Sequence, residues 1–327
     1  MQAKNRLGIG IGKAVAALTF LAVNAAWAQD AYPKRTVEVV VPWTAGQATD
    51  IAARTFAEEL SAKLGQTFFI SNKAGAGGAV GSAYVARANN DGYTLLAAST
   101  GSVIVSPLLN ETSYAASDFV PAAMIAKSPS ILITAADFPA KNINELIKLL
   151  KDNPGKYTFA SSGNGSATHL MAEAFNLGHG IEATHVPYKG SSAALTDVLA
   201  GRVTYMFDTV ASVSGQLKAG KVTAYAISSK DRSASVPDIP AIAEVTELKD
   251  FDIASWIGLM APRGAAPEEL AVIEDVARAY LKTPEAQAKY QGMGLGVNPM
   301  SNQEFQKVVQ REVELYSGLL EQLGLKK

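Results

Sequence analysis

The sequence predicts an α/β protein of two lobes joined by a hinge. Short apolar segments alternate with amphipathic ones, which is the strand, loop and helix order of a largely parallel sheet. Two long apolar segments, residues 119–134 and 251–261, interrupt this order and are suited to carry the chain between lobes. The chain has 327 residues and is 48% hydrophobic, which is enough for two lobes of ordinary size.

The first strand and helix set this pattern. Residues 37–41 are rich in valine, which is typical of a strand buried in a parallel sheet. Pro42 ends the strand because proline has no N–H to donate. Thr49 or Asp50 is expected to cap a helix through residue 64, which Gly65 ends.

The loop between this strand and helix is a candidate anion site. Unpaired N–H groups and the dipole at a helix N-terminus favour a negative charge. The loop offers an aromatic ring, small residues and hydrogen-bonding side chains, and its residues are Trp43, Thr44, Ala45, Gly46, Gln47 and Ala48. A small anionic molecule is therefore the expected ligand.

Two further strands extend the first lobe. Residues 68–70 and 93–98 are predicted strands, and residues 79–88 a helix between them. The later strand stops at Ser99 and Thr100. Open α/β sheets bind ligands at the carboxyl ends of their strands, so this polar loop is also expected to face the site.

The same order restarts in the second lobe. Asn142 followed by Glu145 predicts a capped helix that ends at residue 150. A strand over residues 157–160 then leads into the polar loop 161–169, which opens a helix and forms a second anion site. The remaining elements predicted here are a helix over 170–177, strands at 183–186, 203–207 and 222–228, and helices at 191–199 and from 209 through 219.

The C-terminal part of the chain is predicted to be mostly helical, over residues 267–281, 284–291 and 304–323. These helices are expected to cover the first sheet. The sequence thus divides into lobe 1, made of residues 29–128 and 254–327, and lobe 2, made of residues 129–253. Two crossings between lobes imply a hinge.

The N-terminus is interpreted as a secretory signal peptide. Basic residues, among them Lys4 and Lys13, precede an apolar run over residues 14–23, and small residues end at Ala28, where cleavage is expected. The apolar run is much shorter than the roughly 20 residues that span a bilayer, which argues against a membrane anchor. The mature protein is therefore expected to be exported.

Composition excludes several classes of site. The chain has no cysteine, so it forms no disulfide, no thiolate metal site and no lipid-modified cysteine. A net charge of -1 argues against nucleic acid as a partner. Residues 215–221 resemble a phosphate-binding loop, but Val222 stands where Ser or Thr is required. No cofactor or metal is expected.

Catalytic patterns do not assemble. The histidines form no HExxH pattern, and no GxSxG motif is present. His169 is interpreted as a capping or packing residue, since no carboxylate that could orient it is evident nearby in the sequence. Asp208 ends an apolar strand of the second lobe and is read either as a helix cap or as a carboxylate facing the space between lobes.

Several motifs together carry a family resemblance. In chain order they are residues 42–46 with Thr49 and Asp50, residues 72–78, 91–96, 160–165 and 185–190, Phe207-Asp208, and Ser255-Trp256. In this set the chain resembles the periplasmic solute-binding proteins of tripartite tricarboxylate transporters, often called Bug proteins. The resemblance spans essentially the whole mature chain.

The resemblance implies a type II-like, two-lobed periplasmic-binding-protein fold, with two mixed sheets flanked by helices and a hinge. It implies a receptor that closes on a small carboxylate and delivers it to integral-membrane transporter subunits. By similarity, the ligand-binding residues are Trp43, Thr44, Ala45, Gly46, Gln47, Asp50, Ser99, Thr100, Ser162, Gly163, Asn164, Gly165, Ser166, Thr168 and Asp208. In relatives that bind amino acids, an acid at the position of Asp208 can pair with the ammonium group.

One position departs from the family pattern. Gln47 stands where a second glycine is expected, which adds a donor and an acceptor and narrows the pocket against bulky aromatic acids. The ligand stays open among dicarboxylates, hydroxy acids, amino acids and compact aromatic acids. The alternatives to a transport receptor are an exported enzyme with His169 and Asp208 as acid and base, and a sensor for a membrane kinase. A monomer is the default for this architecture.

Overall fold

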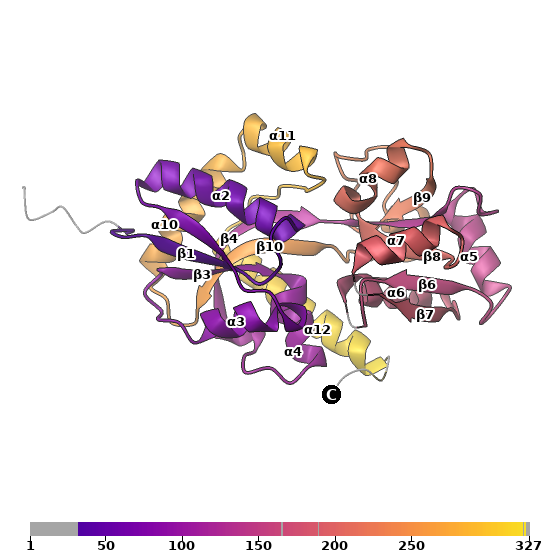
Figure 1. Ribbon diagram of the computed structural model, residues 1–327, viewed down its shortest axis with the longest axis horizontal. Coiled ribbons are helices and arrows are strands. Elements are labelled where there is room, and N and C mark those ends of the chain that lie inside the picture. The colour runs from indigo at the N-terminus through magenta and orange to yellow at the C-terminus, as the bar shows by residue number, and fades with distance from the viewer. Residues whose placement is uncertain (1–31, 165, 189, 323, 325–327) are drawn as a thin grey trace, which may run out of the picture.

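The computed structural model describes residues 32–164, 166–188, 190–322 and 324, and it has two lobes side by side (Figure 1). Each lobe contains one mixed five-stranded sheet. The predicted fold class, two lobes with mixed sheets flanked by helices, is therefore confirmed. The predicted signal peptide, residues 1–28, lies outside the described residues.

The sheet of lobe 1 has the strand order β2-β1-β3-β10-β4. Its strands β1, β2 and β3 are parallel, whereas β10 runs antiparallel to both β3 and β4. The bounds are β1 Val37–Val41, β2 Phe68–Asn72, β3 Thr94–Ser99, β4 Phe119–Ser128 and β10 Ser255–Pro262.

The sheet of lobe 2 has the order β7-β6-β8-β5-β9. Its strands β6, β7 and β8 are parallel, and β5 runs antiparallel to β8 and β9. The bounds are β5 Ser130–Ala135, β6 Thr158–Ser161, β7 Thr184–Pro187, β8 Tyr205–Thr209 and β9 Val222–Ile227.

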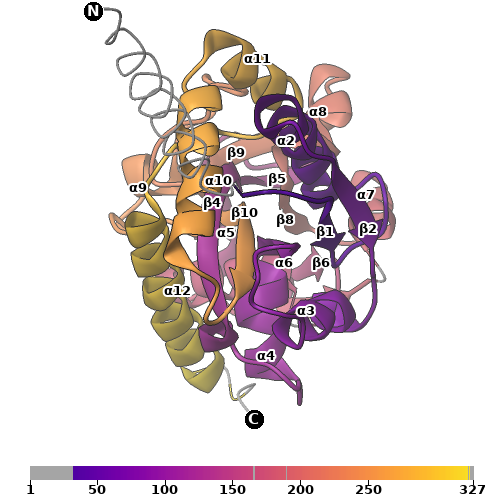
Figure 2. The ribbon, with the colours of Figure 1, turned by 90° about the vertical axis from the view of Figure 1, so that its left-hand side faces the viewer.

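Helices cover both faces of the lobe 1 sheet, as the view from that lobe shows (Figure 2). Alternate strand residues point to opposite faces, so Val39 packs with the α2 and α10 side while Val40 packs with α3 and α12. The helices of this lobe are α2 Ala48–Leu64, α3 Ala79–Ala86, α4 Ser106–Leu109, α10 Pro267–Tyr280, α11 Pro284–Gly292 and α12 Asn302–Gln322. The expectation that the C-terminal helices cover the first sheet is met by α10 and α12.

Four helices of lobe 2 match the predicted ones to within a few residues at their ends, and these are α5 Ile143–Lys151, α6 Ala167–His179, α7 Ser191–Leu199 and α8 Val210–Lys218. The short α9 Ile242–Val245 was not predicted. Short turns that the pattern did not predict are the 3-10 segments Ala76–Gly78 and Ala116–Asp118 and the π-helix Gly101–Val105. Asn142 caps α5 as predicted, because its side chain accepts a hydrogen bond from the Glu145 backbone N–H.

The predicted cap of α2 is wrong, and of the two interpretations of Asp208 the helix cap is excluded. The N-cap of α2 is Gln47 rather than Thr49 or Asp50, because the Asp50 carboxylate turns back to accept the Gly46 N–H. The N-cap of α8 is Thr209, whose hydroxyl accepts the Ser212 N–H, so Asp208 does not cap that helix.

The chain passes between the two sheets at Pro129, the residue that separates β4 from β5. It returns before Ser255, where β10 begins. The backbone also links Lys127 with Gly296 through two hydrogen bonds of 2.7 and 2.9 Å. We propose the two crossings as the division between lobes, at the same places as in the sequence analysis.

A close approach in lobe 1 makes a stability prediction. A Cβ on Gly258, in β10, would lie 2.6 Å from ring carbons of Phe305 and 2.8 Å from the Ala123 carbonyl oxygen. Gly258→Ala should therefore lower the free energy of unfolding by about 2 kcal/mol, as overpacking of a core does, in urea titrations of the mature chain.

Gly215→Ala is the matched control, since a Cβ on that residue of α8 meets nothing within 4 Å. It should be neutral or stabilise by up to about 1 kcal/mol, because alanine is the better helix former. Equal effects of the two substitutions would contradict the packing argument.

Candidate ligand-binding site

The strand registers bring the candidate loops to one place. Ser128 at the end of β4 pairs with Ser255, and Ser99 at the end of β3 pairs with Ile257. In lobe 2, Ser130 at the start of β5 pairs with Thr209 at the end of β8. The carboxyl ends of β1 and β3 in one sheet and of β6 and β8 in the other therefore all face the junction at Pro129.

The first loop is fixed on Trp43. Its indole N–H donates to the Ser99 hydroxyl at 3.3 Å, and its carbonyl accepts from the Asn72 side chain at 3.1 Å. Gly78 lies against the same ring, since a Cβ there would be 2.7 Å from Ser102 and 3.4 Å from Trp43. Glycine at this position therefore allows the backbone to approach Ser102 and the Trp43 ring closely.

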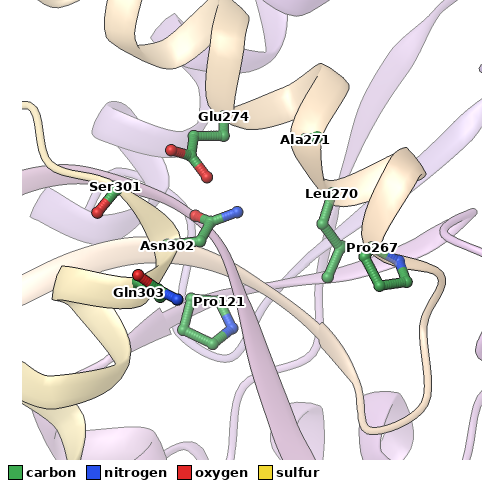
Figure 3. Close-up of a pocket in the computed structure, with 8 residues that line it drawn as sticks. All are labelled: Pro121, Pro267, Leu270, Ala271, Glu274, Ser301, Asn302 and Gln303. Atoms are coloured by element: carbon green, nitrogen blue, oxygen red, sulfur yellow. The ribbon is translucent and has the colours of Figure 1, made fainter.

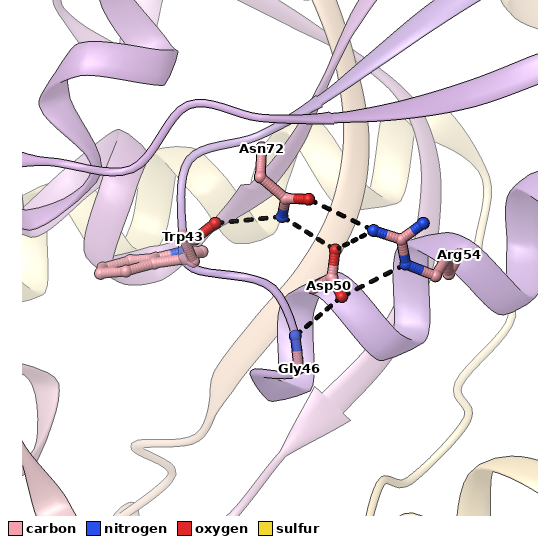
Figure 4. Close-up of polar contacts among 5 residues, drawn as sticks. All are labelled: Trp43, Gly46, Asp50, Arg54 and Asn72. Carbon is pink, nitrogen blue, oxygen red and sulfur yellow. Dashed lines mark hydrogen bonds and ion pairs between the residues drawn. The ribbon is translucent and has the colours of Figure 1, made fainter.

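Asp50 is buried and holds this loop from within its own lobe (Figure 4). Its carboxylate accepts the Gly46 N–H at 2.9 Å and the Asn72 amide at 2.9 Å, and it pairs with Arg54 at 3.0 and 3.3 Å. Burial alone would raise the pKa of Asp50, but the hydrogen bonds from Arg54, Gly46 and Asn72 outweigh it and lower the pKa. Asp50 thus positions the loop and has its oxygens occupied.

The tip of the loop is open. Thr44, Ala45, Gly46 and Gln47 are all exposed. Gly46 has φ +85°, and nothing lies within 4 Å of where its Cβ would be, so glycine is required there by backbone conformation rather than by space. Gln47 is the N-cap of α2, and its side chain makes no capping hydrogen bond to that helix.

Ser99 and Thr100 point in different directions. The Ser99 hydroxyl meets Trp43 and also Ser102, at 3.3 Å. The Thr100 side chain is fully buried, where it accepts the Trp256 backbone N–H and donates to Glu312 at 3.2 Å. The structure therefore places the Thr100 hydroxyl in the interior of lobe 1 and does not bring it together with the first loop.

Glu312 is the centre of that interior network. It accepts the Trp256 indole N–H at 2.7 Å, which ties α12 to the strand that enters lobe 1. Burial raises the pKa of Glu312 to about 7, against the lowering effect of the hydrogen bonds from Trp256 and Thr100. Sequence spacing gave no signal for this contact, because Thr100 and Glu312 are 212 residues apart.

The second loop is built on hydroxyl groups. Thr168 Oγ1 accepts the Ser162 N–H at 3.0 Å and contacts the hydroxyls of Ser162 and Ser166 at 3.0 and 3.1 Å. Ser166 is the N-cap of α6, and its side chain accepts the His169 N–H. Asn164 is exposed and Gly163 is half-buried, whereas Gly165 lies outside the described residues.

Two stacked histidines contact the start of this loop through Ser161. The rings of His169 and His185 are parallel, with centroids 3.8 Å apart, and Ser161 Oγ lies 2.7 Å from His185 Nε2. The expectation that no carboxylate orients His169 is wrong, because Glu173 Oε1 lies 3.4 Å from its Nε2. The spacing of four residues on one helix was the signal that could have found it.

The Ser161 and His185 contact does not expose a nucleophile. Ser161 has no exposed surface, and its hydroxyl also lies 2.9 Å from the Gly163 carbonyl oxygen. A serine nucleophile must reach its substrate, so this arrangement serves the loop itself.

Asp208 is a buried candidate with one oxygen left unsatisfied. It is 1% exposed, its Oδ1 accepts the Thr209 N–H at 2.8 Å, and its buried Oδ2 has no hydrogen-bond partner among the described residues. Burial raises the pKa of Asp208 to about 6, although the Thr209 N–H and the hydroxyls of Ser191 and Ser212 lower it. An unsatisfied buried carboxylate oxygen suits a ligand that brings a donor.

Two surface cavities lie on lobe 1 outside these loops. One of about 350 Å³ opens where α10 meets the start of α12 (Figure 3). The other, of about 610 Å³, lies along α2 and α10. Neither is lined by a residue of the candidate site, so we assign the ligand to neither.

The part of the chain that the structure describes holds no group of three or more His, Asp or Glu side chains arranged to bind a metal ion. None of its helices is long and apolar enough to cross a bilayer.

Comparison with protein families identifies the chain. Residues 52–325 match the family model described as the tripartite tricarboxylate transporter family receptor, TctC. The chain belongs to this receptor family. The family resemblance in the sequence analysis is thereby confirmed.

Solved receptors of similar structure agree with this assignment. A protein of R. palustris determined with adipate is 31% identical, with a TM-score of 0.78 over 90% of this chain and 99% of that one. The periplasmic binding protein BugD is 33% identical, with a TM-score of 0.74 over 90% and 100% of the two chains. MatC of Rhodopseudomonas palustris, with bound malate, is 29% identical, with a TM-score of 0.74 over 88% and 100%.

The network at Asp50 makes a testable prediction. Asp50→Asn removes the charge that accepts from Arg54 and should lower the free energy of unfolding at pH 7 by about 2 kcal/mol, the range for hydrogen bonds to charged groups. Because the folded-state pKa of Asp50 is lowered, its contribution is present above the unfolded pKa of about 3.9 and is lost as pH falls through the folded pKa. Urea unfolding at pH 7 and pH 3 measures both.

Asp152→Asn is the control, since the pair of Lys148 and Asp152 has side chains 75% and 56% exposed. It should change stability by less than about 0.5 kcal/mol. A difference between wild type and Asp50→Asn that stayed constant from pH 7 to pH 3 would contradict the charge argument.

Proposed function

We propose that this protein is a periplasmic receptor that captures a small carboxylate between its lobes and delivers it to the membrane subunits of a tripartite transporter. The observation that carries the proposal is that the N-termini of α2 and α6, one in each lobe, both open at the junction. A helix N-terminus binds anions through backbone N–H groups and its dipole. Two of them facing one space suit a ligand with a carboxylate at each end.

The related structures support the same class of ligand. One similar receptor holds adipate and another holds malate, and both are dicarboxylates. We propose the small carboxylates, namely dicarboxylates, hydroxy acids and amino acids, as the ligand class of this chain.

The proposed contacts come from both lobes. The residues proposed to touch the ligand lie in the loops and strand ends at the junction, and these are Trp43, Thr44, Ala45, Gly46, Gln47, Ser99, Ser162, Gly163, Asn164, Ser166, Thr168 and Asp208. Gly165, which belongs to the second loop in the sequence and lies outside the described residues, is proposed with them. Asp50 and Thr100 are proposed to act on the ligand only through the groups that they position, because their own side chains are engaged inside lobe 1.

Asp208 is proposed to read the distal part of the ligand. Its open Oδ2 would accept a hydrogen bond from a ligand hydroxyl, an ammonium group or a protonated acid. Gln47, on the opposite lobe, offers an exposed amide that can donate or accept. Together they would choose among ligands that the helix ends alone would hold equally well.

We propose that the two lobes close because the ligand contacts both of them. A ligand held by both lobes binds the closed state better than the open one and shifts the equilibrium toward it. The crossings at Pro129 and before Ser255 would act as the hinge. Such binding needs no chemical step, so we propose a receptor that is not an enzyme.

Export and assembly complete the proposal. Cleavage after Ala28 would release the mature receptor into the periplasm, and the absence of cysteine leaves no lipid anchor on it. We propose a monomer that meets its membrane partners in the closed form.

Ligand capture can be tested with protein from which any bound ligand has been removed. Refolded, ligand-stripped mature protein should gain several degrees in Tm with one or more small carboxylates, and the gain should grow with concentration as linkage requires. A thermal-shift panel containing malate, adipate and amino acids measures it, with native mass spectrometry of the unstripped protein. No shift and no retained ligand would reject the receptor proposal.

The second prediction concerns Asp208. Malate can donate a hydroxyl to this carboxylate and ionised adipate cannot, so Asp208→Asn should lower the affinity ratio of malate to adipate by about tenfold. Asp137→Asn, at an exposed acid of the same lobe, should leave the ratio unchanged. Calorimetric titration with each acid provides the ratio, and equal effects on both acids would exclude the proposed role.

The same residue gives a pH dependence. The pKa of Asp208 is about 6 in the free protein, and a bound dianion would raise it further. Adipate affinity should therefore rise as pH falls from 7.5 through 6, and this rise should shrink in Asp208→Asn.

A further inference from the structure

Beneath the second loop, two histidines from different elements share one stack. His169 lies in the first turn of α6 and is 3% exposed, and His185 lies in β7. Their rings are 3.8 Å apart and inclined by 14°, and Phe159 continues the stack at 4.9 Å from His185. Neutral imidazoles can stack this closely, whereas two charged ones would repel each other.

One hydroxyl connects this stack to the loop. Ser161 Oγ lies 2.7 Å from His185 Nε2, 2.9 Å from the Gly163 carbonyl oxygen and 3.2 Å from the Gly163 nitrogen. The hydroxyl has one hydrogen for two possible acceptors, the histidine nitrogen and the carbonyl. If His185 Nε2 carries a proton, it donates to Ser161, and the hydroxyl hydrogen is then directed to Gly163.

The charged groups around the stack are few in the described residues. Glu173, on α6, lies 3.4 Å from His169 Nε2, and Tyr205 of β8 stacks on Phe159 with its hydroxyl donating to Asn176. The pKa of His185 is lowered to about 4, chiefly by burial and then by the neighbouring His169, and Glu173 opposes both. His185 is therefore neutral near pH 7 in the free protein, and a negative charge brought near it favours its protonation.

We propose that His169 and His185 are a proton-linked positioning pair, in which a carboxylate bound at the N-terminus of α6 draws one proton from solvent onto the pair and so locks Ser161 onto Gly163. The inference rests on the proposed function, since it needs an anion at that helix end. His169 belongs to the first turn of the helix, where the charge of the ligand is felt most strongly.

The sign of the effect follows from linkage. The bound anion raises the pKa of His185 above its value in the free protein. Binding is then strengthened at a pH below the pKa of the complex, and the gain is lost as pH rises through that pKa. Protonation therefore strengthens binding in two ways. It adds a positive charge that attracts the anion, and it fixes the loop.

The first test needs no ligand. In the free mature protein, the amide resonance of Gly163 should shift with pH at the same midpoint as the ring resonances of His185 in two-dimensional NMR. Ser161→Ala should abolish that shift of the Gly163 amide and leave the histidine titration in place. His179→Gln, at the other end of α6, is the control and should change neither. A Gly163 amide that does not follow His185 overturns the proposal.

The second test uses adipate in the Asp208→Asn background, which removes the acid of the proposed site that titrates near pH 6. Affinity should rise about tenfold between pH 7.5 and pH 5, which corresponds to a pKa of His185 of about 6 in the complex against about 4 in the free protein. His185→Gln, which keeps a polar group beside Ser161, should reduce this rise to less than about twofold, and His169→Gln should also reduce it.

The outcomes separate the two proposals. A pH-dependent Gly163 amide without binding of any acid in the panel would reject the receptor proposal and with it the uptake of a proton on binding, while the coupling of His185 to Gly163 would stand. If adipate binds with the same pH profile whether or not His185 is replaced by Gln, the positioning pair alone is rejected.

Discussion

The arrangement of the whole site depends on the crossing at Pro129, where β4 of one sheet passes into β5 of the other with one residue between them. Because β10 and β8 pair with these strands in antiparallel register, the carboxyl ends of the parallel strands in both lobes are forced to face the same junction. The polar loops are found there for topological reasons. Their chemistry then decides what the junction binds.

Each of these loops is held by hydrogen bonds within its own lobe. Asp50 fixes the first loop through Gly46 and Asn72, and Thr100 joins the end of β3 to Trp256 and Glu312. The hydroxyl of Thr168 holds the second loop. Loops that are ordered before the ligand arrives lose less conformational entropy on binding, which is how neutral donors can give useful affinity.

The sequence was sufficient for the fold because hydrophobic pattern and breaking residues are local signals. The bounds of most strands and helices match the prediction to within a few residues, and Gly65 ends α2 in the left-handed conformation as expected. Strands β4, β5 and β10 were predicted only as apolar segments that carry the chain between lobes, and the short helices α4 and α9 were not predicted. The caps of α2 and α8 were missed because Asp50 and Asp208 have tertiary environments that outweigh their capping preference.

The site was predicted as a set of loops more successfully than as a set of side chains. The Thr100 side chain is oriented by its hydrogen bond to Glu312, which is 212 residues away in the chain. Residue spacing in the sequence cannot predict such a contact. Glu173 is different, since it lies one helical turn after His169 and was available to sequence analysis. Local pairs are readable from sequence, and contacts between distant segments require the fold.

The two tryptophans outside the predicted signal peptide, Trp43 and Trp256, differ in burial. Trp256 is 1% exposed and locked to Glu312, whereas Trp43 is half-buried and bonded to Ser99 in the first loop. An indole whose surroundings change on lobe closure changes its emission, and the buried one supplies a constant background. The receptor thus contains an intrinsic fluorophore at its proposed site, through which occupancy can be followed without a label.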